Sequence, residues 1–157
     1  MATTRRATAT WSGDLLAGRG TVTAATTGVF RDLPTTWASR TGEPAGVTSP
    51  EELLAAAHAS CFSMACSNIL AKAGTPPDRL DVEVSVTADK LEAGWTVVSA
   101  AIAVRGRVPG ATQESFAAAA AEAVDTNHGV VVIVVAAGVI ALWFLSLAVR
   151  NLRRQRP

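Results

Sequence analysis

The feature that most constrains the fold of this chain is a long helical segment near its middle with clear start and stop signals. Ser49 and Pro50 form a strong helix start, because serine caps the first backbone N–H groups and proline fits the first helical position. Glu52, three residues after the serine, completes a predicted capping box. Gly74 and two following prolines end the segment, so we predict a helix over about residues 50–73. Apolar and small residues fill most of its faces, which predicts a central helix buried on several sides.

Short β-prone segments surround this helix. Some alternate apolar and polar side chains, as half-buried strands do, and turns containing glycine or aspartate separate others. An alanine-rich run at about 113–125 predicts a second helix. Together these elements predict an α+β domain whose antiparallel sheet packs on the central, cysteine-bearing helix and the second helix. The segments predicted as strands are 7–12, 20–25, 35–39, 80–88 and 95–107.

Composition limits the classes of function open to the chain. Its 157 residues suffice for one domain with a core, and its formal net charge of +1 provides no basic field for nucleic acid. Both cysteines, Cys61 and Cys66, lie in the same predicted helix, and no cysteine–histidine cluster has metal-site spacing. No apolar run follows Arg5 and Arg6, so the N-terminus does not look like a secretory signal. We therefore expect a cytoplasmic protein that binds no nucleic acid, metal or cofactor.

Cys61 is the candidate reactive residue. A cysteine attacks as its thiolate, and a nearby arginine favours that form because its charge is permanent. Arg40 lies in the predicted loop before the helix, and Glu51 lies at the helix start, where a carboxylate can hold a guanidinium in place. These three residues are the predicted catalytic site, with a small core residue as the alternative interpretation of Cys61. His58, one turn earlier, is interpreted as a packing or interface residue, with a catalytic base as the alternative.

The run SPEELLAAAHASCFSMACSNILAKAG resembles the signature helix of the OsmC/Ohr family of thiol peroxidases. The opening WSGDLLAGRGTVTA and the turns DKLEAG and VPG are also similar to its OsmC branch, so the resemblance covers residues 8 to about 125. It implies an α+β fold and an intertwined homodimer with the thiols near the dimer interface. It also implies that Cys61 attacks a hydroperoxide and becomes a sulfenic acid, that Arg40 stabilises the thiolate and that Glu51 orients the arginine.

The chain departs from the family pattern after the second helix. Asn127 stands where the family has a second cysteine that forms a disulfide with the first, and the Cys-Pro-Val-Ser motif is absent. We also expect the family's final strand to be missing. Cys66 is a poor substitute, because five positions along a helix separate its Cα from that of Cys61 by about 8–9 Å. A disulfide needs Cα atoms about 4.4–6.8 Å apart.

The C-terminal region has a different character. Residues 129–149 are twenty-one residues without a charge, and four arginines follow in RNLRRQRP. As a helix this run is about 31 Å long, close to the thickness of a bilayer core. We therefore predict an OsmC-like domain over 1–126, truncated at its C-terminal end, and a tail over 127–157 with a transmembrane-like helix. Three interpretations of the tail remain open: a membrane anchor, a segment from another reading frame or gene, and a buried helix inside an unusual dimer.

The resemblance predicts thiol-dependent reduction of organic hydroperoxides in oxidative-stress defence. The partners would be an organic hydroperoxide, a thiol reductant and a second copy of the chain. Because the second cysteine is absent, no residue is expected to perform the disulfide-forming step that the family uses. The alternative function is a non-catalytic, membrane-tethered OsmC-like domain that binds a small hydrophobic molecule or a protein partner.

Overall fold

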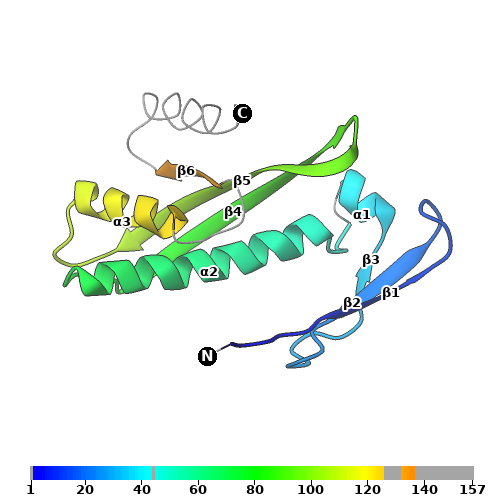
Figure 1. Ribbon diagram of the computed structural model, residues 1–157, viewed down its shortest axis with the longest axis horizontal. Helices are drawn as coiled ribbons and strands as arrows, with labels where there is room; N and C mark the ends of the chain where they lie inside the picture. The colour runs from blue at the N-terminus through cyan, green and yellow to red at the C-terminus, as the bar shows by residue number, and fades with distance from the viewer. Residues whose placement is uncertain (1, 44, 126–131, 137–157) are drawn as a thin grey trace. The chain divides into compact units, whose positions relative to one another are not determined.

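The computed structural model of the protein describes residues 2–43, 45–125 and 132–136. The chain divides into two compact units, one up to Ala56 and one from Ala57 onward. Helix α2 (Pro50–Lys72) carries residues of both (Figure 1). The predicted domain boundary at 126/127 lies at the edge of the described residues and stays a prediction.

Three short antiparallel strands make up most of the first unit. They are β1 (Thr8–Ser12), β2 (Arg19–Thr23) and β3 (Leu33–Thr35), in the order β1-β2-β3. The loop between β1 and β2 is built on Asp14, whose Oδ1 accepts hydrogen bonds from the backbone N–H groups of Leu16 and Ala17 at 2.9 and 2.8 Å. The predicted meander is confirmed in its first two strands.

The third predicted strand is largely wrong. Residues 35–39 contribute only the end of β3, and a short helix, α1 (Trp37–Thr41), follows at once. Thr36 and Ser39 form a reciprocal capping box, in which each side chain bonds the backbone of the other. These local hydrogen bonds give partners to backbone N–H groups at the start of the helix, and they outweigh the β-propensity of threonine and tryptophan. Arg40 therefore lies on a helix and not in a loop.

Helix α2 starts at the predicted residue. Ser49 Oγ accepts a hydrogen bond from the backbone N–H of Glu52 at 3.2 Å, which confirms the serine cap. The other half of the predicted box differs, because Glu52 Oε2 accepts from the hydroxyl of Thr48 at 2.6 Å. At the far end Gly74 adopts a positive φ of 81°, and the N–H of Thr75 bonds the carbonyl of Leu70 at 3.0 Å. A left-handed glycine closes the helix in this way.

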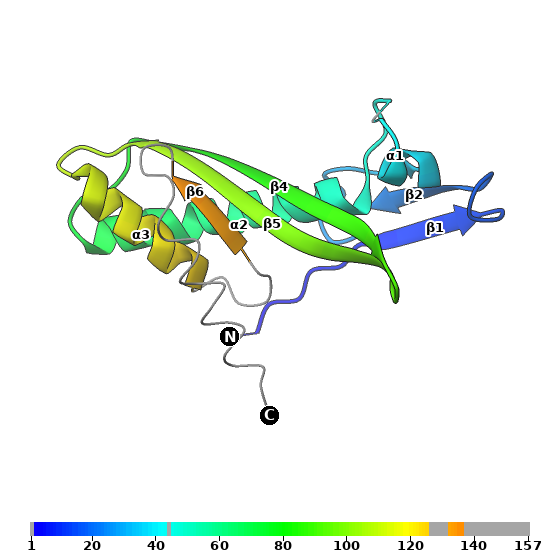
Figure 2. The same cartoon turned by 90° about the horizontal axis from the view of Figure 1, so that it is seen from above.

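The second unit is a long hairpin covered by helices. Strands β4 (Arg79–Leu91) and β5 (Gly94–Arg107) pair antiparallel along their whole length, with one register shift at Thr87/Ala88 (Figure 2). Helix α3 (Gln113–Asp125) follows β5, as predicted. Along β4, exposed and half-buried residues alternate, as the sequence pattern predicts for a strand with one covered face.

The core of this unit joins α2, β5 and α3. One face of α2 is buried, with Phe62, Cys66 and Leu70 spaced one turn apart. They pack with Ile102 and Val104 of β5 and with Ala119, Ala120 and Ala123 of α3. The expectation that α2 is buried on several sides is wrong for the single chain. Its opposite side is an exposed stripe of mostly small or apolar residues: Ala57, Ser60, Cys61, Met64 and Asn68.

A further strand follows α3. Residues Val132–Ala136 form β6, which pairs parallel to Ala100–Val104 of β5. This corrects two expectations, the missing final strand and a helix at these positions. The segment VIVVA is mostly β-branched, and β-branched side chains favour an extended backbone. The rest of the predicted transmembrane-like segment lies outside the described residues. Among the described helices, α2 has the length and composition to cross a bilayer, a property it shares with core helices of ordinary globular proteins.

Candidate functional site

An ion pair between Arg40 and Glu51 joins α1 to the start of α2. Arg40 Nε donates to Glu51 Oε1 at 2.7 Å. The side chains are 27% and 12% exposed, so the pair is shielded from most of the solvent, unlike the exposed pair of Arg79 and Asp81. A charge-assisted hydrogen bond of this length in a partly buried position holds the guanidinium in one orientation. The structure thus places Glu51 against Arg40, and the catalytic roles of the two residues stay predictions.

Only one edge of the guanidinium is used by this pair. The pair uses the Nε of Arg40, and the Cζ of the same guanidinium lies 5.8 Å from the ring centroid of Trp37. The aromatic ring adds a weak attraction that fixes the plane of the guanidinium. Glu51 Oε2 is buried and has no hydrogen-bond partner in the described part of the chain. The arrangement leaves two donors of a fixed cation able to bind an anionic group.

The two cysteines of α2 have opposite environments. Cys61 is exposed, whereas Cys66 is fully buried in the core. Burial raises the pKa of the Cys66 thiol, because the apolar surroundings disfavour the charged thiolate. Cys66 therefore behaves as a small apolar side chain. Cys61 is the thiol that a dissolved substrate can reach.

His58 lies one turn before Cys61 on α2. Its Nε2 atom is buried, and no described residue forms a hydrogen bond with it. This confirms that the imidazole is partly packed away, but a packing role alone leaves the polar nitrogen unsatisfied. Buried polar atoms in native structures nearly always have a partner.

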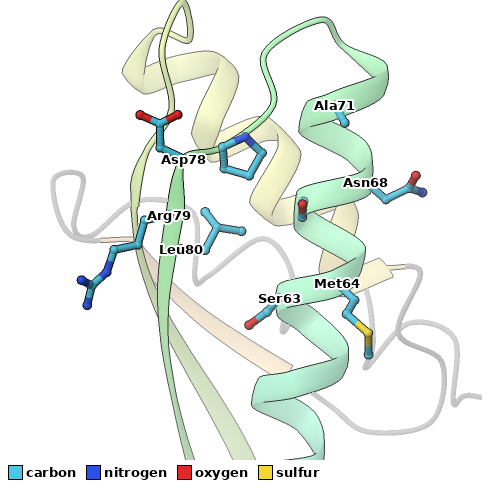
Figure 3. A pocket seen from close by; sticks show the side chains of 9 residues that line it. Ser63, Met64, Asn68, Ala71, Asp78, Arg79 and Leu80 are labelled. Atoms are coloured by element: carbon cyan, nitrogen blue, oxygen red, sulfur yellow. The ribbon is translucent and has the colours of Figure 1, made fainter.

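An open groove begins one turn after Cys61. It has a volume of about 500 Å³ and lies between the C-terminal half of α2 and the start of β4. Met64 and Asn68 line its helix side, and Leu80 points toward α2 from the strand while Arg79 points away (Figure 3). Met64 is 65% exposed and lines the groove, so it is not part of the core of the chain. No metal cluster of three or more ligating side chains occurs among the described residues.

The structure thus joins two of the three predicted site residues. Arg40 and Glu51 form the ion pair in the first unit, and Cys61 follows ten residues after Glu51 on α2, in the second unit. Asn127, the position expected for the second cysteine, lies outside the described residues. The sequence analysis considered His58 as an alternative catalytic base because it lies one turn before Cys61. The burial of its Nε2 without a described hydrogen-bond partner comes from the structure alone.

Comparison with known proteins identifies the family. The family model described as OsmC-like protein matches residues 42–137, more than half of the chain. The chain belongs to the OsmC-like family. The OsmC-like match includes Glu51 and Cys61, begins two residues after Arg40, and continues through β6 into the segment predicted as the tail.

Relatives agree with this membership. Over 112 residues the chain is 38% identical to the peroxiredoxin OsmC of Escherichia coli strain K12, covering 71% of this chain and 77% of that protein. Its fold is similar to that of an organic hydroperoxide resistance protein OsmC from Legionella pneumophila, with a TM-score of 0.61 and 22% identity over 83% of this chain and 96% of the other. OhrB of Bacillus subtilis, an organic hydroperoxide resistance protein, gives a TM-score of 0.56 and 24% identity over 83% and 97%. The chain is therefore an α+β member of the OsmC-like family and a homologue of a peroxiredoxin.

Proposed function

We propose that this OsmC-like protein reduces organic hydroperoxides through Cys61 with an external thiol as reductant. The observation that carries the proposal is the exposure of Cys61, within the segment that matches the family, while Cys66 is buried and kept protonated. Arg40 stabilises the Cys61 thiolate in this proposal, and Glu51 positions the arginine.

The pair of Arg40 and Glu51 supports these roles. A thiolate needs a cation that stays charged, and a guanidinium meets this need at any physiological pH. Glu51 binds the Nε edge at 2.7 Å and leaves the Nη groups available to an anion. Without the carboxylate the long arginine side chain would lose orientation, and with it part of its effect on the thiolate.

The reaction balances as two steps. In the first, the Cys61 thiolate attacks the outer oxygen of ROOH, an S–O bond forms, the O–O bond breaks, and ROH leaves after taking up a proton. The sulfur is oxidised to sulfenic acid and the peroxide is reduced. In the second, thiols reduce the sulfenic acid to Cys61 with release of water and formation of a disulfide between reductant molecules.

A homodimer is the proposed assembly. The exposed stripe on α2 runs through Ala57, Cys61 and Met64 and is mostly small or apolar. Contact of this surface with water is unfavourable, and covering it with another protein surface would be favourable. Small residues let a second helix approach closely. A second copy of α2 packed on this stripe would bring the Cys61 thiols near the interface, as the family resemblance implies.

Thiol oxidation tests the function directly. Treating the reduced protein with cumene hydroperoxide and trapping sulfenic acid with dimedone should label Cys61 within seconds, far faster than free cysteine under the same conditions. An unrelated protein with one exposed cysteine serves as the rate reference. Labelling no faster than that reference would reject the peroxidase assignment in favour of a non-catalytic binding domain.

Cytoplasmic localisation follows from the need for reduced thiols, and we propose it for this protein. The observation that bears on a membrane tether is β6. If residues 132–136 stay in the sheet, 137–149 leaves thirteen uncharged residues, which as a helix would span about 20 Å against a bilayer core of about 30 Å. Tethering would therefore require β6 to leave β5. Carbonate extraction of membranes from expressing cells separates the soluble protein from the tethered one.

A further inference from the structure

His58 is a titratable side chain that the proposed reaction does not yet use. Its Nε2 is buried and has no hydrogen-bond partner among the described residues. It belongs to the same helix and the same unit as Cys61, three residues earlier. An unpartnered buried nitrogen beside a reactive thiol points to a group that arrives only with the substrate.

Helix geometry places the two side chains together. Residues three apart on a helix are surface neighbours, with Cβ atoms about 5–6 Å apart. Side chains also tilt toward the helix N-terminus, so Cys61 leans back over the turn that carries His58. Of the side chains within one turn of Cys61 on either side, residues 57–65, His58 is the one imidazole, the side chain that most often serves in general acid–base catalysis.

The reaction has an unmet need for a proton. When the thiolate attacks the outer oxygen of an alkyl hydroperoxide, the departing oxygen is an alkoxide, which is strongly basic and a poor leaving group. Arg40 does not supply the proton, because a guanidinium stays protonated in proteins. A side chain that changes protonation near pH 7 is suited to this transfer.

We propose that His58 is a catalytic acid that protonates the leaving oxygen of the hydroperoxide. The Cys61 thiol loses its proton to water before the attack, and Nε2 holds a proton taken from water. The S–O bond forms and the O–O bond breaks as Nε2 gives this proton to the departing oxygen, which leaves as ROH. Sulfur loses two electrons, the peroxide gains them, and water returns the proton to His58, which ends in its starting state. This role rests on the proposed peroxidase function and adds a residue to it.

Two oxidants separate this role from a structural one. Cumene hydroperoxide expels an alkoxide that needs a proton, whereas peracetic acid expels acetate, a weak base that needs none. The rate of Cys61 oxidation by each is measured in the wild type and in His58→Gln, which keeps an amide near the Nε2 position but does not relay protons. His58→Asn provides a second variant, and Ser67→Ala, on the same helix but outside the exposed stripe, is the matched control.

We expect His58→Gln to slow oxidation by cumene hydroperoxide by about 100-fold, a typical contribution of general acid–base catalysis, and to leave the peracetic acid rate within about twofold. Equal losses with both oxidants would mean that the site is distorted, and no loss with either would mean that His58 takes no part. Both results overturn the proposal. If wild-type Cys61 reacts slowly with both oxidants, the peroxidase function itself is rejected.

Discussion

At the residue scale, burial separates the two thiols of α2. Cys61→Ser should abolish peroxide-dependent oxidation, because it removes the exposed sulfur. Cys66→Ala should retain most of it, since burial raises the pKa of that thiol and excludes peroxide. Alanine is the better replacement at this site because a buried, unpaired serine hydroxyl costs about 1–3 kcal/mol. Consumption of cumene hydroperoxide with dithiothreitol as reductant measures both variants, and equal loss in the two would reject the assignment of Cys61.

Arg40 is the second residue of the proposed site. A cation within about 4–6 Å favours a thiolate by a factor of about 10 or more, so Arg40→Ala should slow alkylation of Cys61 by iodoacetamide at least about tenfold at pH 7. The variant also leaves the partly buried carboxylate of Glu51 unpaired, which should lower the free energy of unfolding by about 1–3 kcal/mol. The double variant Arg40→Ala/Glu51→Gln should recover part of the stability and none of the thiol reactivity. An unchanged alkylation rate would move the role to another arginine, with Arg31 the first to test.

At the element scale, the start of α2 is set by one hydrogen bond. Ser49→Ala removes the cap on the N–H of Glu52 and should lower the free energy of unfolding by about 1 kcal/mol. Ser67→Ala is a matched control inside the same helix, away from its start, where alanine has the higher helix propensity and a small gain is expected. Urea midpoints at constant m-value measure both variants. An equal change in the two would mean that Ser49 does not act as a cap.

The same elements show what the sequence was able to predict. The start of α2, the whole of α3 and the β4–β5 hairpin follow from caps and from alternation, which are local signals. Helix α1 was missed because it has only five residues and contains β-prone side chains. The capping box of Thr36 and Ser39 decides for the helix, and this local signal is weak in the sequence. The pairing of Arg40 with Glu51 was predicted. The exposure of Met64 was not, because a helix that is apolar on nearly all faces does not reveal which face its own chain covers.

At the scale of the whole molecule, the exposed stripe on α2 predicts self-association. Light scattering should give about twice the chain mass of 16.2 kDa. Met64→Glu should raise the dissociation constant on the order of 100-fold, because the interface would then bury an unpaired charge. Met64 is 65% exposed in the single chain, so the fold itself should tolerate the change. Glu83→Lys, on the exposed face of β4, is the control and should leave the mass unchanged.

The cysteine content of the whole chain determines how the proposed reaction ends. There are two cysteines, both on α2, and their Cα atoms are about 8–9 Å apart in a regular helix, beyond the reach of a disulfide. Oxidised Cys61 should therefore remain a sulfenic acid until an external thiol reduces it, and excess peroxide should drive it on to sulfinic acid. Intact-mass measurement after stepwise peroxide addition should show the gain of one and then two oxygen atoms on Cys61, and dithiothreitol should reverse only the first. Cys66→Ala is the control and should give the same products.

A loss of two hydrogens within one chain, mapped to Cys61–Cys66 and absent from the control, would show that α2 opens locally and that its two cysteines form a disulfide. A doubled mass on a non-reducing gel would instead show that a disulfide joins the Cys61 residues of two copies. Either result would contradict the requirement for an external thiol.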